Sequence, residues 1–311
     1  MTEETWDVVI AGGGPAGLSA ALMLGRSRRR VLVIDGGSPR NRFAAHMHGV
    51  LGMEGIAPTD LKQRGREEVA GYGVEFADGA IERVEQGPSG LRVTDDRGRV
   101  RLARTLVAAT GLTDVLPDMP GLVERWGSTV LHCPYCHGWE VRDQRLGVLA
   151  TSPFSLHVAE LVRQLSDRVT VFTAGLAQLG DEAEQRLRSR GVQLEPAPVA
   201  EILGAGDRIN AARLIDGREI PLDALFVGGL FRPHDDYLAP LKLARNDLPF
   251  GSFTAVDGTG RTSNEHVWAI GNLVNPMATV PMSIGAGAHT GAAVNAALAG
   301  WDFDAAVAAA A

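Results

Sequence analysis

Short apolar runs separated by a glycine turn and a helical segment dominate the start of the chain. Residues 7–11 (DVVIA) form an apolar run typical of a buried strand. A glycine-rich turn follows at residues 12–17, and residues 18–24, rich in Ala and Leu, favour a helix. Residues 31–34 (VLVI) are a second apolar run, which ends at Asp35. This order predicts a strand, a glycine turn, a helix and a second buried strand.

The glycines of this turn have the spacing of a dinucleotide-binding motif. Gly12, Gly14 and Gly17 give GxGxxG, and Asp35 lies 18 residues after Gly17. The glycines allow a tight turn, close approach of the backbone to a pyrophosphate, and close packing of helix on strand. The helix start offers free N–H groups to the phosphates, and the acid is placed for a ribose contact. Because the whole strand–turn–helix–strand–acid context is present, the sequence predicts dinucleotide binding rather than a chance glycine loop.

Two later segments have the pattern of further strands of the same domain. Residues 106–111 (LVAATG) predict a strand that runs into a Thr110-Gly111 turn, and residues 267–272 (VWAIGN) predict a strand that ends at Gly271 and Asn272. Residues 285–298 predict a helix rich in Ala and Gly. Such small residues allow a close approach to a sheet or a cofactor, although helix propensity alone explains part of this composition.

Length and composition bound the class of protein. A chain of 311 residues is long enough for two domains, and 45% hydrophobic with 22% charged residues is ordinary for a globular protein. The formal net charge of -7 predicts no nucleic-acid partner. No apolar stretch is long enough for a membrane span. No basic segment precedes the first apolar run, so we expect no signal peptide and a cytoplasmic location.

The two cysteines of the chain lie three positions apart, in Cys133-Pro134-Tyr135-Cys136. Pro134 suits the first turn of a helix, and a helix N-terminus favours a thiolate. In a reducing compartment such a pair is more often a reversible redox disulfide than a structural one. The alternatives are two buried cysteines or half of a zinc site, for which His132 and His137 could nominally supply ligands. Adjacent residues do not easily converge on one ion, so we expect redox chemistry and no metal.

In its motifs and their order the chain resembles the thioredoxin reductase family, the low-molecular-weight flavoprotein disulfide oxidoreductases. The motifs that carry this resemblance are residues 12–17, 35–37, 109–111, 133–136 and 269–272. The resemblance implies an α/β fold with two Rossmann-like three-layer domains. It implies a discontinuous FAD-binding domain, residues 1–117 and 233–311, with a smaller inserted domain at residues 118–232 that carries the CxxC. It also implies a homodimer.

The resemblance also assigns roles to individual residues. Cys136 would face the flavin, and Cys133 would exchange with the substrate. The implied FAD-binding residues are Gly12, Gly14, Pro15, Ala16, Gly17, Asp35, Asn41, Thr110, Gly111, Gly271 and Asn272. The reductases usually carry Asp where this chain has Asn272, and an amide can still hydrogen-bond to a ribityl chain or a phosphate.

The inserted domain departs from the reductase pattern where NADPH would bind. The reductases have a second glycine-rich turn there, followed by arginines for the 2′-phosphate. Here residues 145–149 predict a strand, but the turn at residues 150–154 (ATSPF) contains no glycine, and Pro153 removes a donor N–H. The next strand, residues 169–172, ends in neutral residues. We therefore expect that the nicotinamide site has been lost, the alternative being an unusual turn that still binds NADPH.

The chain is most similar to the dithiol oxidases of the gliotoxin and holomycin type, whose CxxC is likewise followed by His-Gly, here His137 and Gly138. This implies oxidation of a small-molecule dithiol, with electrons passing through Cys133 and Cys136 to FAD and then to O2, giving H2O2. His137 would act as base and then acid for the exchanging thiols, or would only cap backbone. The alternative activity is thioredoxin reduction driven by NADPH or another donor.

Three other histidines are weaker candidates. His46 and His48 lie in the segment that covers the cofactor in related flavoproteins, so they are expected at the mouth of the site, or else on the surface. His289 lies on the last predicted helix, and would help to protonate flavin or substrate if it reached the site.

Overall fold

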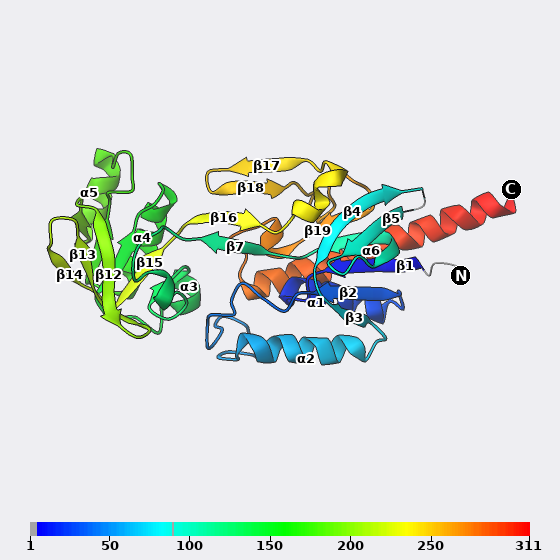
Figure 1. Ribbon diagram of the computed structural model, residues 1–311, viewed down its shortest axis with the longest axis horizontal. Helices are drawn as coiled ribbons and strands as arrows, with labels where there is room; N and C mark the ends of the chain where they lie inside the picture. The colour runs from blue at the N-terminus through cyan, green and yellow to red at the C-terminus, as the bar shows by residue number, and fades with distance from the viewer. Residues whose placement is uncertain (1–4, 89) are drawn as a thin grey trace.

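The computed structural model describes residues 5–88 and 90–311 and divides the chain into two domains joined by a pair of strands (Figure 1). In the larger domain the strands are β1 (Thr5–Ala11), β2 (Val31–Asp35), β3 (Glu75–Asp78), β4 (Ile81–Gly87), β5 (Gly90–Asp95), β6 (Val100–Ala108), β17 (Arg245–Leu248), β18 (Gly251–Thr254) and β19 (Val267–Ala269). Its helices are α1 (Pro15–Arg26), α2 (Pro58–Ala70) and α6 (Val280–Ala310), with short 3₁₀ turns η2 (Asp236–Leu241) and η3 (Gly271–Leu273).

The main sheet of the larger domain has the strand order β3-β2-β1-β6-β5-β4, with β19 paired to the second half of β6. Strands β3, β2, β1, β6 and β19 are parallel, whereas β5 pairs antiparallel with the first half of β6 and β4 pairs antiparallel with β5. Side chains of β1 alternate between two cores. Val8 and Ile10 pack with α1, α2 and α6, and Val9 and Ala11 pack with β4 and β5. The domain is therefore a helix layer, a parallel sheet and an antiparallel layer.

The inserted domain repeats this arrangement on a smaller scale. Its strands are β8 (Val130–Leu131), β9 (Leu146–Leu149), β10 (Val169–Phe172), β11 (Gln193–Glu195), β12 (Val199–Ala205), β13 (Arg208–Leu214), β14 (Glu219–Pro221) and β15 (Ala224–Val227). Its helices are α3 (Pro134–His137), α4 (Phe154–Leu165) and α5 (Asp181–Ser189), with the turn η1 (Val123–Arg125). The parallel sheet β11-β10-β9-β15-β8 lies between α4 and α5 on one face and the antiparallel sheet β12-β13-β14 on the other.

The chain leaves the larger domain through β7 (Leu112–Val115) and returns through β16 (Leu230–Pro233). These strands pair antiparallel, with Val115 opposite Leu230 and Leu112 opposite Pro233, and they bridge the two domains in Figure 1. The expected fold class is confirmed: two Rossmann-like three-layer units, of which the first is discontinuous. The boundaries at residues 118 and 232 stay a prediction, three residues beyond the end of β7 and inside β16.

Helices α1 and α6 are longer than their expected ranges, and α3 is short. Helix α6 begins before residue 285 and continues to Ala310, because its Ala-rich tail favours a helix. Helix α3 spans only four residues, so the dipole of a long helix is not available to stabilise a thiolate at Cys133. None of the helices formed by the described residues has the length and apolarity that a bilayer span requires.

Close packing of α6 on α1 holds the last helix against the glycine turn. A Cβ added at Gly287 would overlap the carbonyl oxygen of Ala16, and one added at Gly291 would lie 2.9 Å from that of Ala20. At Gly285, on the same helix, an added Cβ would meet no atom within 4 Å. The two glycines near α1 are therefore required by the contact, whereas Gly285 is not.

We predict that Gly287→Ala lowers the free energy of unfolding by about 1–3 kcal/mol, because backbone must move to admit the methyl group. Gly285→Ala is the matched control, and it should be neutral or stabilise by about 0.5–1 kcal/mol since the helix loses a flexible glycine. Urea unfolding followed by circular dichroism measures both. Equal stability of the two variants would contradict the close contact.

Candidate functional site

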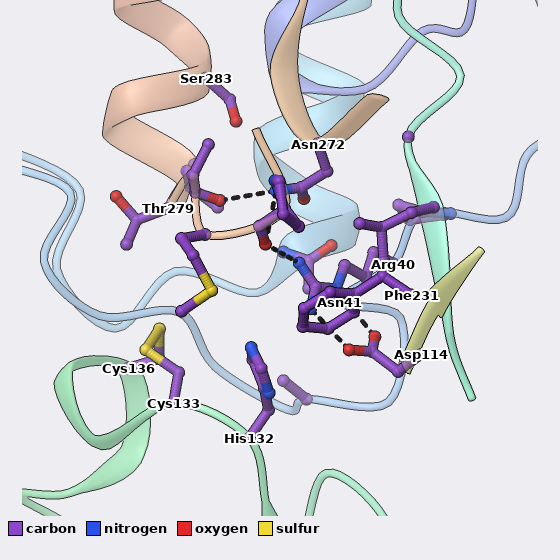
Figure 2. Close-up of a pocket in the computed structure, with 18 of the residues that line it drawn as sticks. Arg40, Asn41, Asp114, His132, Cys133, Cys136, Phe231, Asn272, Thr279 and Ser283 are labelled. Carbon is purple, nitrogen blue, oxygen red and sulfur yellow. Dashed lines mark hydrogen bonds and ion pairs between the residues drawn. A yellow bond between two sulfur atoms is a disulfide. The ribbon is translucent and has the colours of Figure 1, made fainter. Parts of the chain in front are cut away.

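One cavity of about 570 Å³ lies where the two domains meet. It is lined by the β1–α1 turn, the loop between β2 and α2, the disulfide turn at α3 and the segment that enters α6. Figure 2 shows Cys133, Cys136 and His132 on one side of this cavity and Asn272, Thr279 and Ser283 on the other. The structure thus brings the predicted cofactor residues and the predicted redox pair to the same space.

The β1–α1 turn forms a cradle at one end of the cavity. Gly12 has φ +98°, and a Cβ at Gly17 would overlap the carbonyl of Gly12, so both positions require glycine. A Cβ at Gly14 would meet nothing within 4 Å, and Gly14 faces the cavity. Pro15 begins α1, and within residues 5–88 and 90–311 no side chain caps the N-terminus of this helix. Open space at Gly14 beside uncapped helix donors fits the pyrophosphate of a dinucleotide.

Asp35 lies at the end of β2 and lines the same cavity. Its Oδ2 is 2.5 Å from Nζ of Lys62. Burial alone raises the pKa of Asp35, but the Lys62 ammonium and the N–H groups of Gly13 and Gly37 together hold it below its usual range. The side chain is therefore an ionised acceptor at neutral pH, which suits a ribose hydroxyl.

The other predicted cofactor residues surround the cavity at four points. Asn41, Thr110, Gly111, Gly271 and Asn272 all line it, as do Pro15 and Ala16. Gly111 and Gly271 have φ of +71° and +67°, which explains why glycine follows each strand. The Thr110 hydroxyl donates to the carbonyl of His234 at 2.6 Å, so it also fixes the end of β16.

The hydrogen bonds of Asn272 show why an amide suits this position, where the reductases usually carry Asp. Its Nδ2 donates to the carbonyl oxygens of Asn275 and Ala278, at 3.0 and 2.9 Å. A carboxylate could only accept, so Asp at this position would face these carbonyls without a donor. The amide therefore holds the loop that leads into α6, and its Oδ1 is left as an acceptor.

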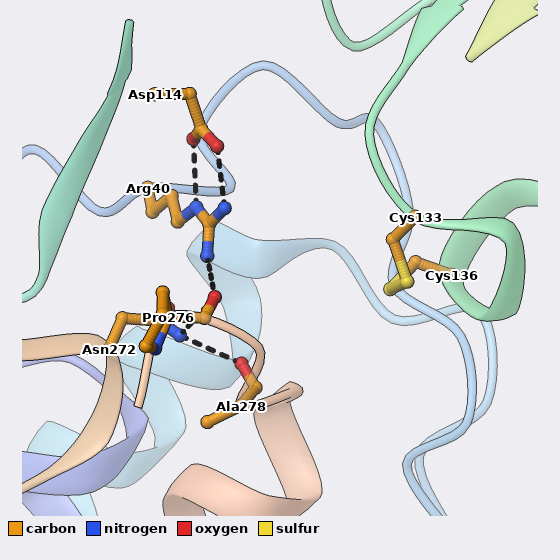
Figure 3. Close-up of a disulfide and its surroundings, with 7 residues drawn as sticks. All are labelled: Arg40, Asp114, Cys133, Cys136, Asn272, Pro276 and Ala278. Carbon is orange, nitrogen blue, oxygen red and sulfur yellow. Dashed lines mark hydrogen bonds and ion pairs between the residues drawn. A yellow bond between two sulfur atoms is a disulfide. The ribbon is translucent and has the colours of Figure 1, made fainter. Parts of the chain in front are cut away.

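A buried ion pair that the sequence did not suggest connects three segments of the site. The Arg40 guanidinium donates to both carboxylate oxygens of Asp114, at 2.8 and 2.5 Å, and to the carbonyl of Pro276 at 2.8 Å (Figure 3). The Asp114 side chain is 8% exposed. This bidentate arrangement ties the loop after β2 to β7 and to the α6 entry. Arg40 and Asp114 are 74 positions apart, so no short sequence motif predicts this ion pair.

Cys133 and Cys136 form a disulfide across the single turn of α3, with Pro134 at the first helical position as expected. The backbone N–H groups of Cys136 and His137 donate to the carbonyl of Cys133, at 3.1 and 3.2 Å. Both cysteines line the cavity, and no free cysteine is present. Among the described residues no cluster of His, Cys, Asp and Glu is arranged to hold a metal ion.

Two histidine rings, those of His137 and His48, lie at the disulfide turn. The His137 ring lies 6.5 Å from that of His48, edge to face. Burial lowers the pKa of His137, and the Glu140 carboxylate opposes this shift, so the ring is neutral at pH 7. His48 is 2.6 Å from Glu54 and 3.5 Å from Glu140, which links the larger domain to the insert. A neutral imidazole beside a disulfide can accept the proton of an incoming thiol.

Of the three weaker histidine candidates, two line the cavity and one does not. His46 and His48 line the cavity, as expected. His289 is exposed on α6 and does not line it, so the structure does not bring His289 to the site. His132, considered only as a zinc ligand, has a buried Nδ1 without a hydrogen-bond partner in the described part of the chain. Burial, followed by the nearby Arg40, lowers the pKa of His132 to about 4.

The glycine-free turn between β9 and α4 is closed by its own side chains. The Ser155 hydroxyl accepts from the N–H groups of Thr151 and Ser152, at 3.2 and 3.4 Å. The Thr151 hydroxyl donates to the carbonyl of Gly228. The amide groups that a phosphate would use are therefore already satisfied.

Comparisons with known proteins agree with this geometry. A family model described as "Pyridine nucleotide-disulphide oxidoreductase" matches residues 6–291. The protein is similar to "Thioredoxin reductase sirT" of Leptosphaeria maculans, with 30% identity over 93% of each chain. Its structure is similar to the crystal structure of HlmI, with a TM-score of 0.93, 42% identity, and coverage of 98% of this chain and 96% of HlmI.

A third similar structure is that of an oxidoreductase from Agrobacterium tumefaciens, with a TM-score of 0.90 and 37% identity over 95% of this chain and 99% of that one. The cofactor is FAD, which the open Gly14 cradle and the ionised Asp35 fit. The chain belongs to the pyridine nucleotide-disulphide oxidoreductase family, and it is a flavin-dependent disulfide oxidoreductase of the thioredoxin reductase type.

Proposed function

We propose that the protein is a dithiol oxidase that closes an intramolecular disulfide in a small-molecule dithiol and delivers the electrons to O2. One observation carries this proposal. The disulfide opens into the same cavity as the Gly14 cradle, whereas the turn where a second nucleotide would bind is occupied by Ser155. With no nicotinamide as the donor, the thiols of a substrate would supply the electrons through this disulfide.

The reaction begins with thiol–disulfide exchange. One substrate thiolate attacks Sγ of Cys133, the Cys133–Cys136 bond breaks, and Cys136 leaves as a thiolate. The second substrate thiolate attacks the substrate sulfur bound to Cys133. The cyclic disulfide is then released, and Cys133 leaves as a thiolate. The substrate has lost two electrons and two protons, and the enzyme pair has gained the electrons.

Bound FAD would supply a two-electron acceptor that can react with O2, and the overall reaction would convert dithiol and O2 to cyclic disulfide and H2O2. The chain's own residues hold this arrangement. FAD would be held by the cofactor residues named in the preceding subsection. His137 takes the substrate protons because its ring is neutral and His137 lines the same cavity as the disulfide. Cys136 is the member of the pair assigned to the flavin side. The homodimer and the cytoplasmic location remain part of this proposal.

Thioredoxin reduction with NADPH is the second candidate, and the names of relatives such as the Leptosphaeria maculans protein favour it. Its requirement is a working nucleotide site at the β9–α4 turn. Pro153, at the N-cap of α4, has no N–H to offer a phosphate, and the two N–H groups before it already bond to Ser155.

Turnover of a dithiol with O2 tests the proposed activity. We expect oxygen uptake and H2O2 with dithiothreitol, and much less with a monothiol, which cannot close a ring. Cys133→Ser and Cys136→Ser should each lower the rate by at least about a thousandfold, because the first removes the sulfur that the substrate attacks and the second removes the leaving thiolate. Full dithiol oxidation by Cys136→Ser would exclude this pathway.

Anaerobic mixing separates the two candidate activities. With the FAD-loaded protein, excess dithiothreitol should bleach the visible flavin absorbance, whereas NADPH at the same concentration should leave it unchanged. The reason is the occupied turn at Thr151 and Ser152. Rapid bleaching by NADPH would show a functional nicotinamide site and favour the reductase.

The pH dependence of flavin reduction tests His137. Since burial holds its pKa below 6.5, the ring accepts protons above that pKa and loses this capacity as the pH falls through it. Wild-type reduction by a dithiol should therefore show an acidic limb below pH 6.5, and His137→Gln should remove this limb and lower the rate by about 100-fold. His289→Gln, altered outside the cavity, is the control. An unchanged profile in His137→Gln would assign His137 to structure alone.

A further inference from the structure

A continuous row of aromatic rings runs along the cavity from helix α4 to the disulfide. The ring of His157 lies 5.7 Å from that of Phe154, which lies 6.2 Å from Phe250. Phe250 lies 5.6 Å from Phe231, and Phe231 lies 5.6 Å from His132. All five residues line the cavity, and we call them the aromatic wall.

The aromatic wall is assembled from separate parts of the fold. His157 and Phe154 belong to the first turn of α4, in the inserted domain, and Phe231 belongs to β16. Phe250 lies in the turn between β17 and β18, where its carbonyl accepts from the N–H of Phe231 at 2.9 Å. In Figure 1 this hairpin lies above β16 and β7. Segments from both domains thus form one surface.

The aromatic wall keeps solvent-exposed ring surface at Phe154. Phe154 is 39% exposed, although it lines a cavity and contacts two other rings. An apolar ring that keeps an open face in a cavity is available to a ligand. Aromatic ring centroids 4.5–7 Å apart attract each other in tilted or edge-to-face arrangements, so a flat ligand ring can extend the row.

The charged side chains of the cavity favour an uncharged substrate. The charged residues that line the cavity in the described part of the chain are Asp35, Lys62, Arg40 and Asp114, and they form two ion pairs with each other. A carboxylate or ammonium on the substrate would therefore be desolvated without a partner. His132, at the disulfide end, stays neutral at pH 7 because burial lowers its pKa to about 4.

Resting on dithiol oxidation as the proposed function, we propose that the aromatic wall binds the frame of an uncharged dithiol that carries a flat ring. Phe154 and Phe250 are the residues that determine this preference. The wall ends at His132, next to Cys133, so a frame stacked on it places its sulfur atoms at the disulfide. Charged thiols, such as glutathione, are poor substrates because the charged side chains of the cavity are already paired with each other.

Two dithiols that close rings of the same size test this assignment. The first probe is 1,2-bis(sulfanylmethyl)benzene, and the second is dithiothreitol, which has no aromatic ring. We expect wild-type kcat/KM from oxygen uptake to be about tenfold higher for the aromatic dithiol, as a ring contact predicts. Phe154→Leu and Phe250→Leu, which keep an apolar side chain, should reduce this ratio to about threefold or less, mainly through KM.

Phe303→Leu is the matched control, because Phe303 is 76% exposed on α6 and does not line the cavity. It should leave the ratio unchanged. A wild type without preference for the aromatic dithiol overturns the inference. Variants that lower kcat/KM equally for both dithiols also overturn it, because the rings would then serve only as a contact between the domains.

A binding measurement separates this inference from the proposed function. The cyclic disulfide formed from the aromatic dithiol can be titrated calorimetrically into the FAD-loaded protein. We expect its Kd to rise about tenfold in Phe154→Leu. If wild type binds it with this dependence but oxidises neither dithiol, the proposed function fails and the aromatic wall stands as a binding site. If wild type does not bind it, the wall is not a ligand site.

Discussion

The antiparallel pairing of β7 with β16 determines where the disulfide lies relative to the glycine cradle. The chain leaves and re-enters the larger domain through this single ladder, so its register sets how the insert is placed. His234 secures the base of the ladder: its backbone N–H donates to the carbonyl of Gly111 at 3.0 Å, and its ring nitrogens bond to Thr113 and Thr110. The Arg40–Asp114 pair fixes β7 from the other side. Together these hydrogen bonds and this ion pair restrict the movement of β7 and β16 relative to the larger domain.

Contacts beyond the ladder then bring the disulfide turn over the cavity. The backbone of Gly127, at φ +84°, packs against Phe43 so closely that an added Cβ would lie 2.7 Å from the Phe43 Cβ. His48 reaches Glu140 across the same boundary. Glu54 holds the other side of the His48 ring, and this contact, together with the N–H of Gly49, lowers the pKa of the Glu54 carboxyl. Groups from two domains therefore meet around His137.

The sequence predicted those parts of the site whose residues lie close together in the chain. The glycine turn, the acid at the end of β2 and the CxxC each lie within a short segment, so their spacing carries their geometry. The Arg40–Asp114 pair, the contact of His48 with Glu140 and the aromatic wall join segments far apart in the chain. Their formation depends on the register of β7 on β16, which no spacing reveals.

The same limit explains the differences in the fold. The parallel strands were visible as apolar runs, but the antiparallel layers that cover them have alternating, partly exposed strands with a weaker signal. The short α3 had a proline at its start but no apolar period to predict its end. His289 was a candidate because it lies on α6, the helix expected near the cofactor. It faces solvent because Gly287 and Gly291 place the opposite side of α6 against α1.

The change at the β9–α4 turn has two consequences that favour the same direction of electron flow. The Ser155 hydroxyl accepts from the N–H groups of Thr151 and Ser152, so these two donors are already used at the turn where a pyrophosphate would bind. At the same position the chain begins α4 with Phe154, whose ring enters the cavity that holds the disulfide. In the proposed function, this single turn would therefore disfavour a nicotinamide donor and provide apolar surface for a thiol donor. Because the parallel sheet β11-β10-β9-β15-β8 does not depend on a bound nucleotide for its core, this exchange leaves the fold intact.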